Sequence, residues 1–138
     1  MRQVLWGSKK IPYEAAAESR TAGNALGQSF CLLNNRAQNE FMSRVYKSKY
    51  CLDIQPIAAI HDAVYFIIKQ DPEVVKFVND NLIECMEWQD DPAISHDKVK
   101  LGAELVIHYP DWSTEINVPN KSTLEEIKEI LNEKIKVN

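Results

Sequence analysis

The stretch Pro56-Ile57-Ala58-Ala59-Ile60-His61-Asp62-Ala63-Val64-Tyr65-Phe66-Ile67-Ile68 decides the fold class of this 138-residue chain. Two runs rich in β-branched and aromatic residues, 56–60 and 64–68, are separated only by His61-Asp62-Ala63. Such runs favour strands, and so short a connection favours an antiparallel hairpin. The sequence therefore predicts a hairpin with His61 and Asp62 at its tip.

A helical pattern precedes the hairpin and covers residues 13–46. Its apolar residues recur at helical spacing and form one stripe, which consists of Phe30, Leu33, Ala37, Phe41 and Val45. Gly23 and Gly27 lower helix propensity, so we expect a bend or break near them. Residues 4–12 are expected to form a short strand or turn.

Signals for two more helices and a strand follow the hairpin. Asp71-Pro72-Glu73 supplies an N-cap, a first-turn proline and a first-turn acid. The helix that it opens should end near Trp88 and bury Val74, Val75, Val78, Leu82 and Met86. A strand is expected at 101–108, and Ser122-Thr123-Leu124-Glu125 is typical of a capping box that opens a terminal helix. The apolar face of that helix comprises Leu124, Ile127, Leu131 and Ile135.

The order helix, hairpin, helix, strand, helix predicts an α+β fold in which a long N-terminal helix packs on an antiparallel hairpin. A composition of 45% hydrophobic and 26% charged residues is typical of one soluble domain. No apolar run approaches the roughly 20 residues that span a bilayer, so we expect a soluble cytoplasmic protein. Cys31, Cys51 and Cys85 lack CxxC spacing, which favours buried or partly buried free thiols.

The net charge of −4 is unevenly distributed along the chain. Residues 1–50 carry eight Lys or Arg against three Glu, whereas residues 51–138 carry eight basic against seventeen acidic residues. The basic first part can face phosphates, and a basic surface without a partner is the alternative.

Three polar residues of this first part, Arg20, Asn24 and Gln28, recur every four positions. On a helix they share one face and can reach a single elongated ligand. Their donors and acceptors suit the minor groove, where all base pairs present similar acceptors. A face that contacts only solvent is the alternative interpretation.

Asp62 at the hairpin tip is a candidate ligand for a hard cation, of which magnesium is the natural choice. One aspartate cannot hold a two-metal site, and the alternative is an ordinary turn. Motifs of other enzyme classes, including GxSxG, the P-loop, HExxH and GxGxxG, are absent. His61-Asp62 and His96-Asp97 weakly resemble metal-dependent hydrolases, but His108 is the only histidine left to complete such a site.

Read in order, these segments resemble the C-terminal palm of family A (DNA polymerase I-like) DNA polymerases over residues 4–112. The family's "L-x-G-R-R-x-x-x-P" stretch is similar to Leu5-Trp6-Gly7-Ser8-Lys9-Lys10-Ile11-Pro12, and its "E-R-x-x-x-N-x-x-x-Q" helix is similar to Glu18-Ser19-Arg20-Thr21-Ala22-Gly23-Asn24-Ala25-Leu26-Gly27-Gln28. Its motif C "V-H-D-E" hairpin resembles Ile60-His61-Asp62. The "x-N-W" sequence that closes the family's palm resembles Pro110-Asp111-Trp112.

The resemblance implies roles for particular residues. Arg20, Asn24 and Gln28 would contact the minor groove of the primer-template, with Lys9 and Lys10 as further DNA contacts. His61 would position the primer terminus, and Asp62 would be one of two metal-binding aspartates. With Mg²⁺, the reaction would be template-directed attack of the primer 3′-hydroxyl on a deoxynucleotide α-phosphate during DNA replication.

The resemblance also has departures. Ala63 stands where the family usually has Glu, and residues 113–138 form an extension with one helix beyond the palm part, 1–112. The first catalytic aspartate, the fingers and the thumb fall outside the resemblance.

We therefore expect this chain to be the C-terminal part of a split or truncated polymerase, inactive alone and from a phage-like genome. Its partner would be a separate N-terminal portion that holds the deoxynucleotide. A decayed, non-catalytic palm module that binds DNA or a protein is the alternative.

Overall fold

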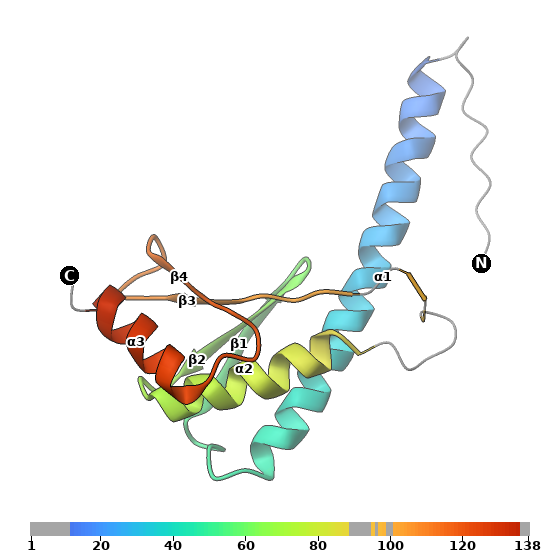
Figure 1. Cartoon of the computed structure of the whole chain (residues 1–138). Coiled ribbons are helices and arrows are strands. Elements are labelled where there is room, and N and C mark those ends of the chain that lie inside the picture. The colour runs from blue at the N-terminus through green and yellow to red at the C-terminus, as the bar shows by residue number, and fades with distance from the viewer. Residues whose placement is uncertain (1–11, 89–94, 96, 99–100, 136–138) are drawn as a thin grey trace.

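The structure is a computed structural model that describes residues 12–88, 95, 97–98 and 101–135 (Figure 1). Its elements, in chain order, are α1 (Pro12–Tyr46), β1 (Ile54–Ile60), β2 (Ala63–Ile68), α2 (Pro72–Met86), β3 (Leu105–His108), β4 (Glu115–Val118) and α3 (Leu124–Ile135). The α+β class is confirmed. The expectation for 4–12, and with it Lys9 and Lys10, lies outside the described residues.

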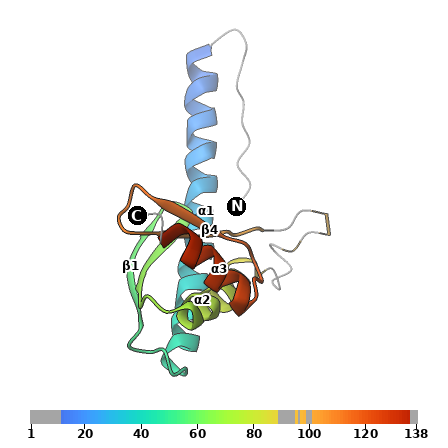
Figure 2. The same cartoon turned by 60° about the vertical axis from the view of Figure 1, so that its left-hand side comes forward.

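Helix α1 runs without interruption from Pro12 to Tyr46, so of the bend or break expected near Gly23 and Gly27 the break is wrong. A Cβ atom at either glycine would meet nothing within 4 Å, because this part of the helix is open to solvent. Each glycine lowers helix propensity, but the hydrogen bonds of the helix continue through both. Figures 1 and 2 show the N-terminal half of α1 projecting beyond the other described helices and strands.

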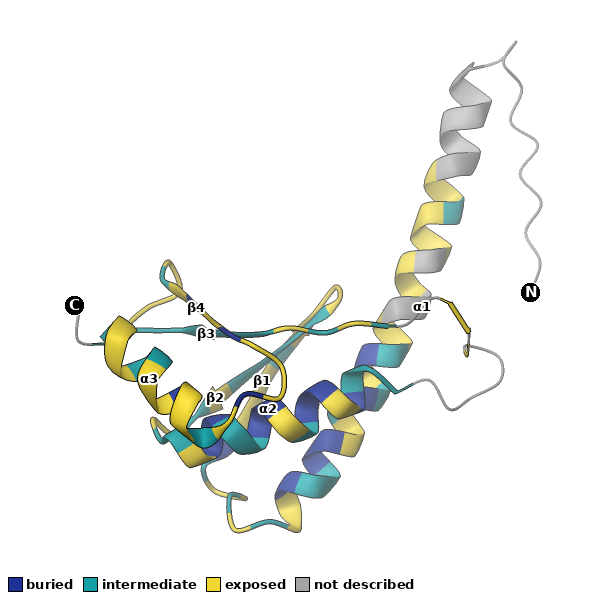
Figure 3. Cartoon of the chain, in the orientation of Figure 1, coloured by how far each residue is buried: buried dark blue, intermediate teal, exposed yellow. Residues whose placement is uncertain are grey.

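The C-terminal half of α1 carries the predicted apolar stripe into the core. Ala37, Phe41 and Val45 are buried and Leu33 is half-buried. Figure 3 shows buried residues along the C-terminal half of α1. The side chain of Phe30 lies outside what the structure describes. Helical spacing therefore predicted this part of the core correctly.

The predicted hairpin is confirmed. Strands β1 and β2 are antiparallel, Ile60 pairs with Ala63, and His61-Asp62 forms the two-residue connection. The register shifts between Pro56 and Ala58, which marks a bulge in β1.

Helix α2 begins as its capping signal predicted. The Asp71 side chain accepts a hydrogen bond from the Glu73 backbone N–H at 2.9 Å, and Pro72 occupies the first turn. The predicted inward residues are buried except Met86, which is half-buried against the core. The helix ends at Met86, two residues before Trp88.

The C-terminal region contains a strand that the sequence pattern did not indicate. Strand β4 pairs antiparallel with β3, which begins at Leu105 rather than at 101. Residues 113–138 thus contribute β4 to a sheet with β3, and α3 packs against α2 and β4.

The capping box of α3 starts one residue later than predicted. The backbone N–H of Thr123 donates to the Glu126 carboxylate at 2.7 Å, and the Glu126 N–H donates to the Thr123 hydroxyl at 3.3 Å. Ser122 is buried instead, and its hydroxyl donates to the Pro119 carbonyl at 2.7 Å. The preceding turn therefore uses the serine that the pattern assigned to the cap.

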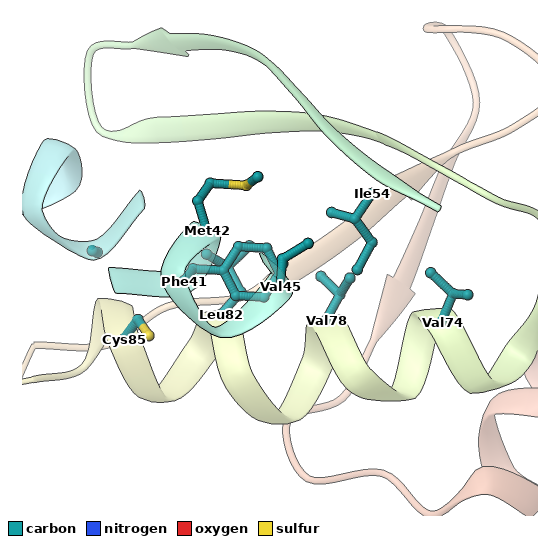
Figure 4. Packing of buried hydrophobic residues seen from close by; sticks show 9 residues of the cluster. Phe41, Met42, Val45, Ile54, Val74, Val78, Leu82 and Cys85 are labelled. Carbon is teal, nitrogen blue, oxygen red and sulfur yellow. The ribbon is translucent and has the colours of Figure 1, made fainter. Parts of the chain in front are cut away.

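The core lies where α1 and α2 cross beneath the hairpin (Figure 4). Phe41 is fully buried, and its ring centroid lies 5.2 Å from that of Phe66 in β2 and 6.2 Å from that of Phe77 in α2. A smaller cluster of Val75, Val118 and Ile127 joins α2, β4 and α3.

Two further expectations concern cysteines and membranes. All three cysteines are free, but Cys31 in α1 and Cys51 in the loop before β1 are exposed, and only Cys85 is buried. Within the described ranges, no helix is both long and apolar enough to cross a membrane.

Candidate functional site

The hairpin tip presents its two polar side chains to solvent. His61 and Asp62 are both exposed, and His61 has a φ of 54°, in the left-handed region that few side chains other than Asn, Asp and His adopt readily. The connection is only two residues long, so the strands on either side determine where the Asp62 carboxylate lies.

Helix α1 fixes this tip from the side. The side-chain amide of Asn34 donates to the His61 carbonyl at 3.0 Å, and the Cys31 thiol lies 3.5 Å from the same oxygen. Asn34 is 7% exposed, so it is a buried polar residue whose amide is used to hold the turn. Sequence reasoning missed both residues, because they are 27 and 30 positions from His61 and no local pattern links them.

The three residues predicted to contact the DNA minor groove lie on α1, the helix that also contacts the hairpin tip. Arg20, Asn24 and Gln28 are exposed, which fits both a ligand-contacting face and a face that contacts only solvent. At 100° per residue, they and the two tip contacts, Cys31 and Asn34, fall within about one third of the helix circumference. The structure therefore brings the polar row and the hairpin tip to one face of α1.

The dimensions of this row suit an elongated ligand. Gln28 lies eight positions after Arg20, which is about 12 Å of helix at 1.5 Å per residue. That length equals three to four base-pair steps at about 3.4 Å each. The row ends about one helical turn before Cys31, where the tip is attached.

Contacts of α1 with α2 and with Trp88, just beyond α2, hold the two helices together. The Arg36 guanidinium donates to the Cys85 carbonyl at 2.6 Å and lies 3.8 Å from the centre of the Trp88 ring. Arg44 donates to the Glu84 carboxylate at 2.6 Å, and this hydrogen bond raises the pKa of the arginine. The charge of Arg44 is therefore held at the crossing of the two helices.

The described residues do not form a complete metal-binding site. No three His, Cys, Asp or Glu side chains of the described ranges gather into a group that could hold a metal ion. Asp62 offers one exposed carboxylate, which fits a hard cation such as Mg²⁺, but a two-metal site needs at least one further acid, and none of the described residues joins Asp62 in such a group. His96 lies outside the described residues, and His108 stacks on Trp112 with ring centroids 4.8 Å apart.

An open cleft adjoins the tip. It measures roughly 1400 Å³, and Asp62 lines it together with β2, β3 and the upper face of α2. This volume exceeds the 300 to 1,000 Å³ typical of small-molecule pockets, so a larger occupant fits it better.

Comparisons with protein-family models, curated proteins and solved structures find no match for this chain. The geometry of the α1 face and the tip, together with the sequence resemblance, is the basis of the function proposed below.

Proposed function

We propose that this chain is the C-terminal palm part of a split family A DNA polymerase. One observation carries the proposal: Asn34 attaches the His61-Asp62 tip to the face of α1 that bears Arg20, Asn24 and Gln28. A composite site needs this arrangement, because the carboxylate must lie at a fixed position along the DNA that the row contacts.

The DNA contacts would be made by the polar row. Asn24 and Gln28 both donate and accept hydrogen bonds, and Arg20 only donates, which matches the acceptors shared by all base pairs in the minor groove. Binding through this row is therefore expected to be nearly independent of sequence. The basic charge of residues 1–50 attracts the phosphates on either side.

Asp62 would supply one carboxylate to a magnesium site completed by an aspartate of the N-terminal portion. Bound Mg²⁺ would lower the barrier to attack of the primer 3′-hydroxyl on the α-phosphate of a deoxynucleotide, with release of pyrophosphate. His61, beside Asp62, would orient the primer terminus. The nucleotide pocket would belong to the partner, so the chain alone is expected to be inactive.

A decayed palm module is the second candidate. Ala63, the first residue of β2, stands where the resemblance would place a supporting glutamate, which favours loss of catalysis. Such a module would still bind DNA through α1 or dock on a protein.

Primer extension separates the two candidates. The chain, an N-terminal family A polymerase portion and their mixture are incubated with primed template, Mg²⁺ and deoxynucleotides. Extension is expected only in the mixture, and the Asp62→Asn variant, which keeps the shape of the tip, should reduce it by at least about a hundredfold. Glu129→Gln removes an exposed carboxylate of α3 and is the matched control.

DNA binding is measured in parallel by fluorescence anisotropy. Arg20→Ala should weaken binding and lower the salt dependence by about one counterion, whereas Lys134→Ala, which removes an exposed lysine of α3, should change neither. A mixture that binds DNA through Arg20 and never extends a primer would establish the decayed module. Binding that is unchanged by Arg20→Ala and extension that is unchanged by Asp62→Asn would overturn both.

A further inference from the structure

The hairpin that carries Asp62 packs one face of β2 on the core. The residues of β2 that pack there, against the larger core cluster, are Val64, Phe66 and Ile68. Because side chains alternate between the two faces of a strand, Tyr65 and Ile67 lie on the other, outer face. An isolated two-stranded hairpin is at best marginally stable, so contacts on the outer face also determine how firmly the tip is held.

Trp112 covers part of this outer face. It lies in the loop between β3 and β4, and its ring centroid is 5.1 Å from that of Tyr65, at an interplanar angle of 35°. Tyr65 is half-buried, whereas Ile67, on the same face of β2, is 62% exposed. Tyr65 is the third residue after Asp62, which is about 10 Å of extended chain. The ring contact therefore holds the hairpin close to its tip.

The loop that carries Trp112 is itself held by hydrogen bonds. The Asp111 carboxylate accepts from the Ser113 hydroxyl at 2.6 Å and from the Ser113 backbone N–H at 2.9 Å, and both bonds lower the pKa of Asp111. On β3, the His108 ring stacks on that of Trp112 with centroids 4.8 Å apart and an interplanar angle of 8°. The β3–β4 hairpin therefore fixes the Trp112 ring before that ring meets β2.

The exposure of Trp112 distinguishes this contact from core packing. The side chain is 63% exposed, and its ring contacts are with Tyr65 and His108. The tip thus has two supports outside its own strands, because Asn34 of α1 holds the His61 carbonyl and Trp112 holds the ring of Tyr65.

We propose that Trp112 is a positioning residue for the Asp62 carboxylate and that it acts through Tyr65. Together with Asn34, the β3–β4 loop then sets the direction in which the tip points. The use of Asp62 in a magnesium site rests on the proposed function, whereas the support of the tip by Trp112 does not.

Hydrogen–deuterium exchange of the full chain tests this support directly. Trp112→Ala removes the ring, and the amides of residues 62–65 should exchange about twofold to tenfold faster. Trp112→Phe keeps a ring at this position and should restore most of the protection. Tyr46→Ala, which removes a similarly exposed ring from the end of α1, is the matched control and should leave these amides unchanged.

The path through Tyr65 is tested by combining variants. When Tyr65 is already replaced by alanine, Trp112→Ala should cause no further acceleration at the tip, because its partner ring is absent. The amides of residues 78–85 in α2 report the core and should exchange at the wild-type rate in every variant.

Primer extension tests the consequence for Asp62. In the mixture with the N-terminal polymerase portion, Trp112→Ala should lower kcat about tenfold, because a displaced carboxylate no longer meets the reacting groups. The KM for primed template should stay within about twofold, because the polar row of α1 is unchanged. Trp112→Phe should recover most of kcat.

The outcomes separate this proposal from the proposed function. Faster exchange at the tip in Trp112→Ala, restored in Trp112→Phe, would support the role of Trp112 even if no mixture extends a primer, a result that would count against the polymerase function alone. In an active mixture, an unchanged kcat for Trp112→Ala would refute the positioning role and leave the function standing. Acceleration that is equally large in α2, or that adds fully to the effect of Tyr65→Ala, would also overturn the proposal.

Discussion

Replacing Asn34 by alanine should loosen the hairpin tip without unfolding the chain. The Asn34 side chain donates to the His61 carbonyl at 3.0 Å, and alanine removes this donor. The thiol of Cys31, at 3.5 Å, is a weak donor and does not replace it. The expected result is faster opening of the turn that carries Asp62.

The magnitude follows from the geometry. An uncharged hydrogen bond contributes about 0.5 to 1.5 kcal/mol net, and water can reach the exposed tip, so we expect a loss of about 1 kcal/mol. His61 has a φ of 54°, and the same contact helps to hold the backbone in this left-handed conformation. A loss of about 1 kcal/mol increases the open population of the tip about fivefold.

Two measurements check this prediction. Amide exchange at Asp62 and Ala63 should be about fivefold faster in Asn34→Ala, and urea unfolding should give a loss of about 1 kcal/mol. Asn35→Ala is the matched control, because it removes an identical, exposed side chain from the next position of α1. Equal exchange at the tip in the two variants would refute the assigned role of Asn34.

The remaining predictions concern the core, the acid stability and the projecting half of α1. Phe41→Ala should lower the free energy of unfolding by about 3 to 5 kcal/mol in urea titration, because the ring is fully buried between Phe66 and Phe77; a loss below about 1 kcal/mol would contradict this packing. The Glu126 carboxylate accepts hydrogen bonds from the Thr123 backbone and side chain, which lowers the pKa of Glu126. Its contribution to stability is therefore present above the glutamate pKa of the unfolded chain, and it is lost as pH falls through the pKa of Glu126 in the folded chain. Glu126→Ala should therefore lose less stability than the wild type between about pH 5 and pH 3, and parallel acid profiles of unfolding free energy would argue against the cap. Gly23→Ala should slow amide exchange nearby by stabilising the helix by about 1 kcal/mol, with the urea midpoint unchanged; faster exchange would show that the glycine is needed there.

Local patterns predicted the elements whose formation depends on neighbours in the chain. The β-rich runs around His61-Asp62 predicted the hairpin, and Asp71 marked the start of α2, because turns and caps are made within a few residues. Helical spacing placed Phe41 in the core for the same reason.

Local patterns were wrong where a distant contact or open solvent decides the outcome. Strand β4 is short and forms because β3 lies beside it, and Ser122 serves the turn at Pro119 instead of capping α3. The break expected at Gly23 and Gly27 is absent, because propensity alone does not end a helix whose backbone hydrogen bonds continue.

The sequence by itself determined the α+β class, the place of Asp62 at the tip of a hairpin and the spacing of Arg20, Asn24 and Gln28 on one helix. Only the tertiary structure decided that Asn34 attaches the tip to that helix face, and that β2 and β3 border one cleft. The physical reason is distance along the chain: periodicity reports which face a residue occupies, whereas a contact between residues 27 positions apart depends on how the helices and strands pack.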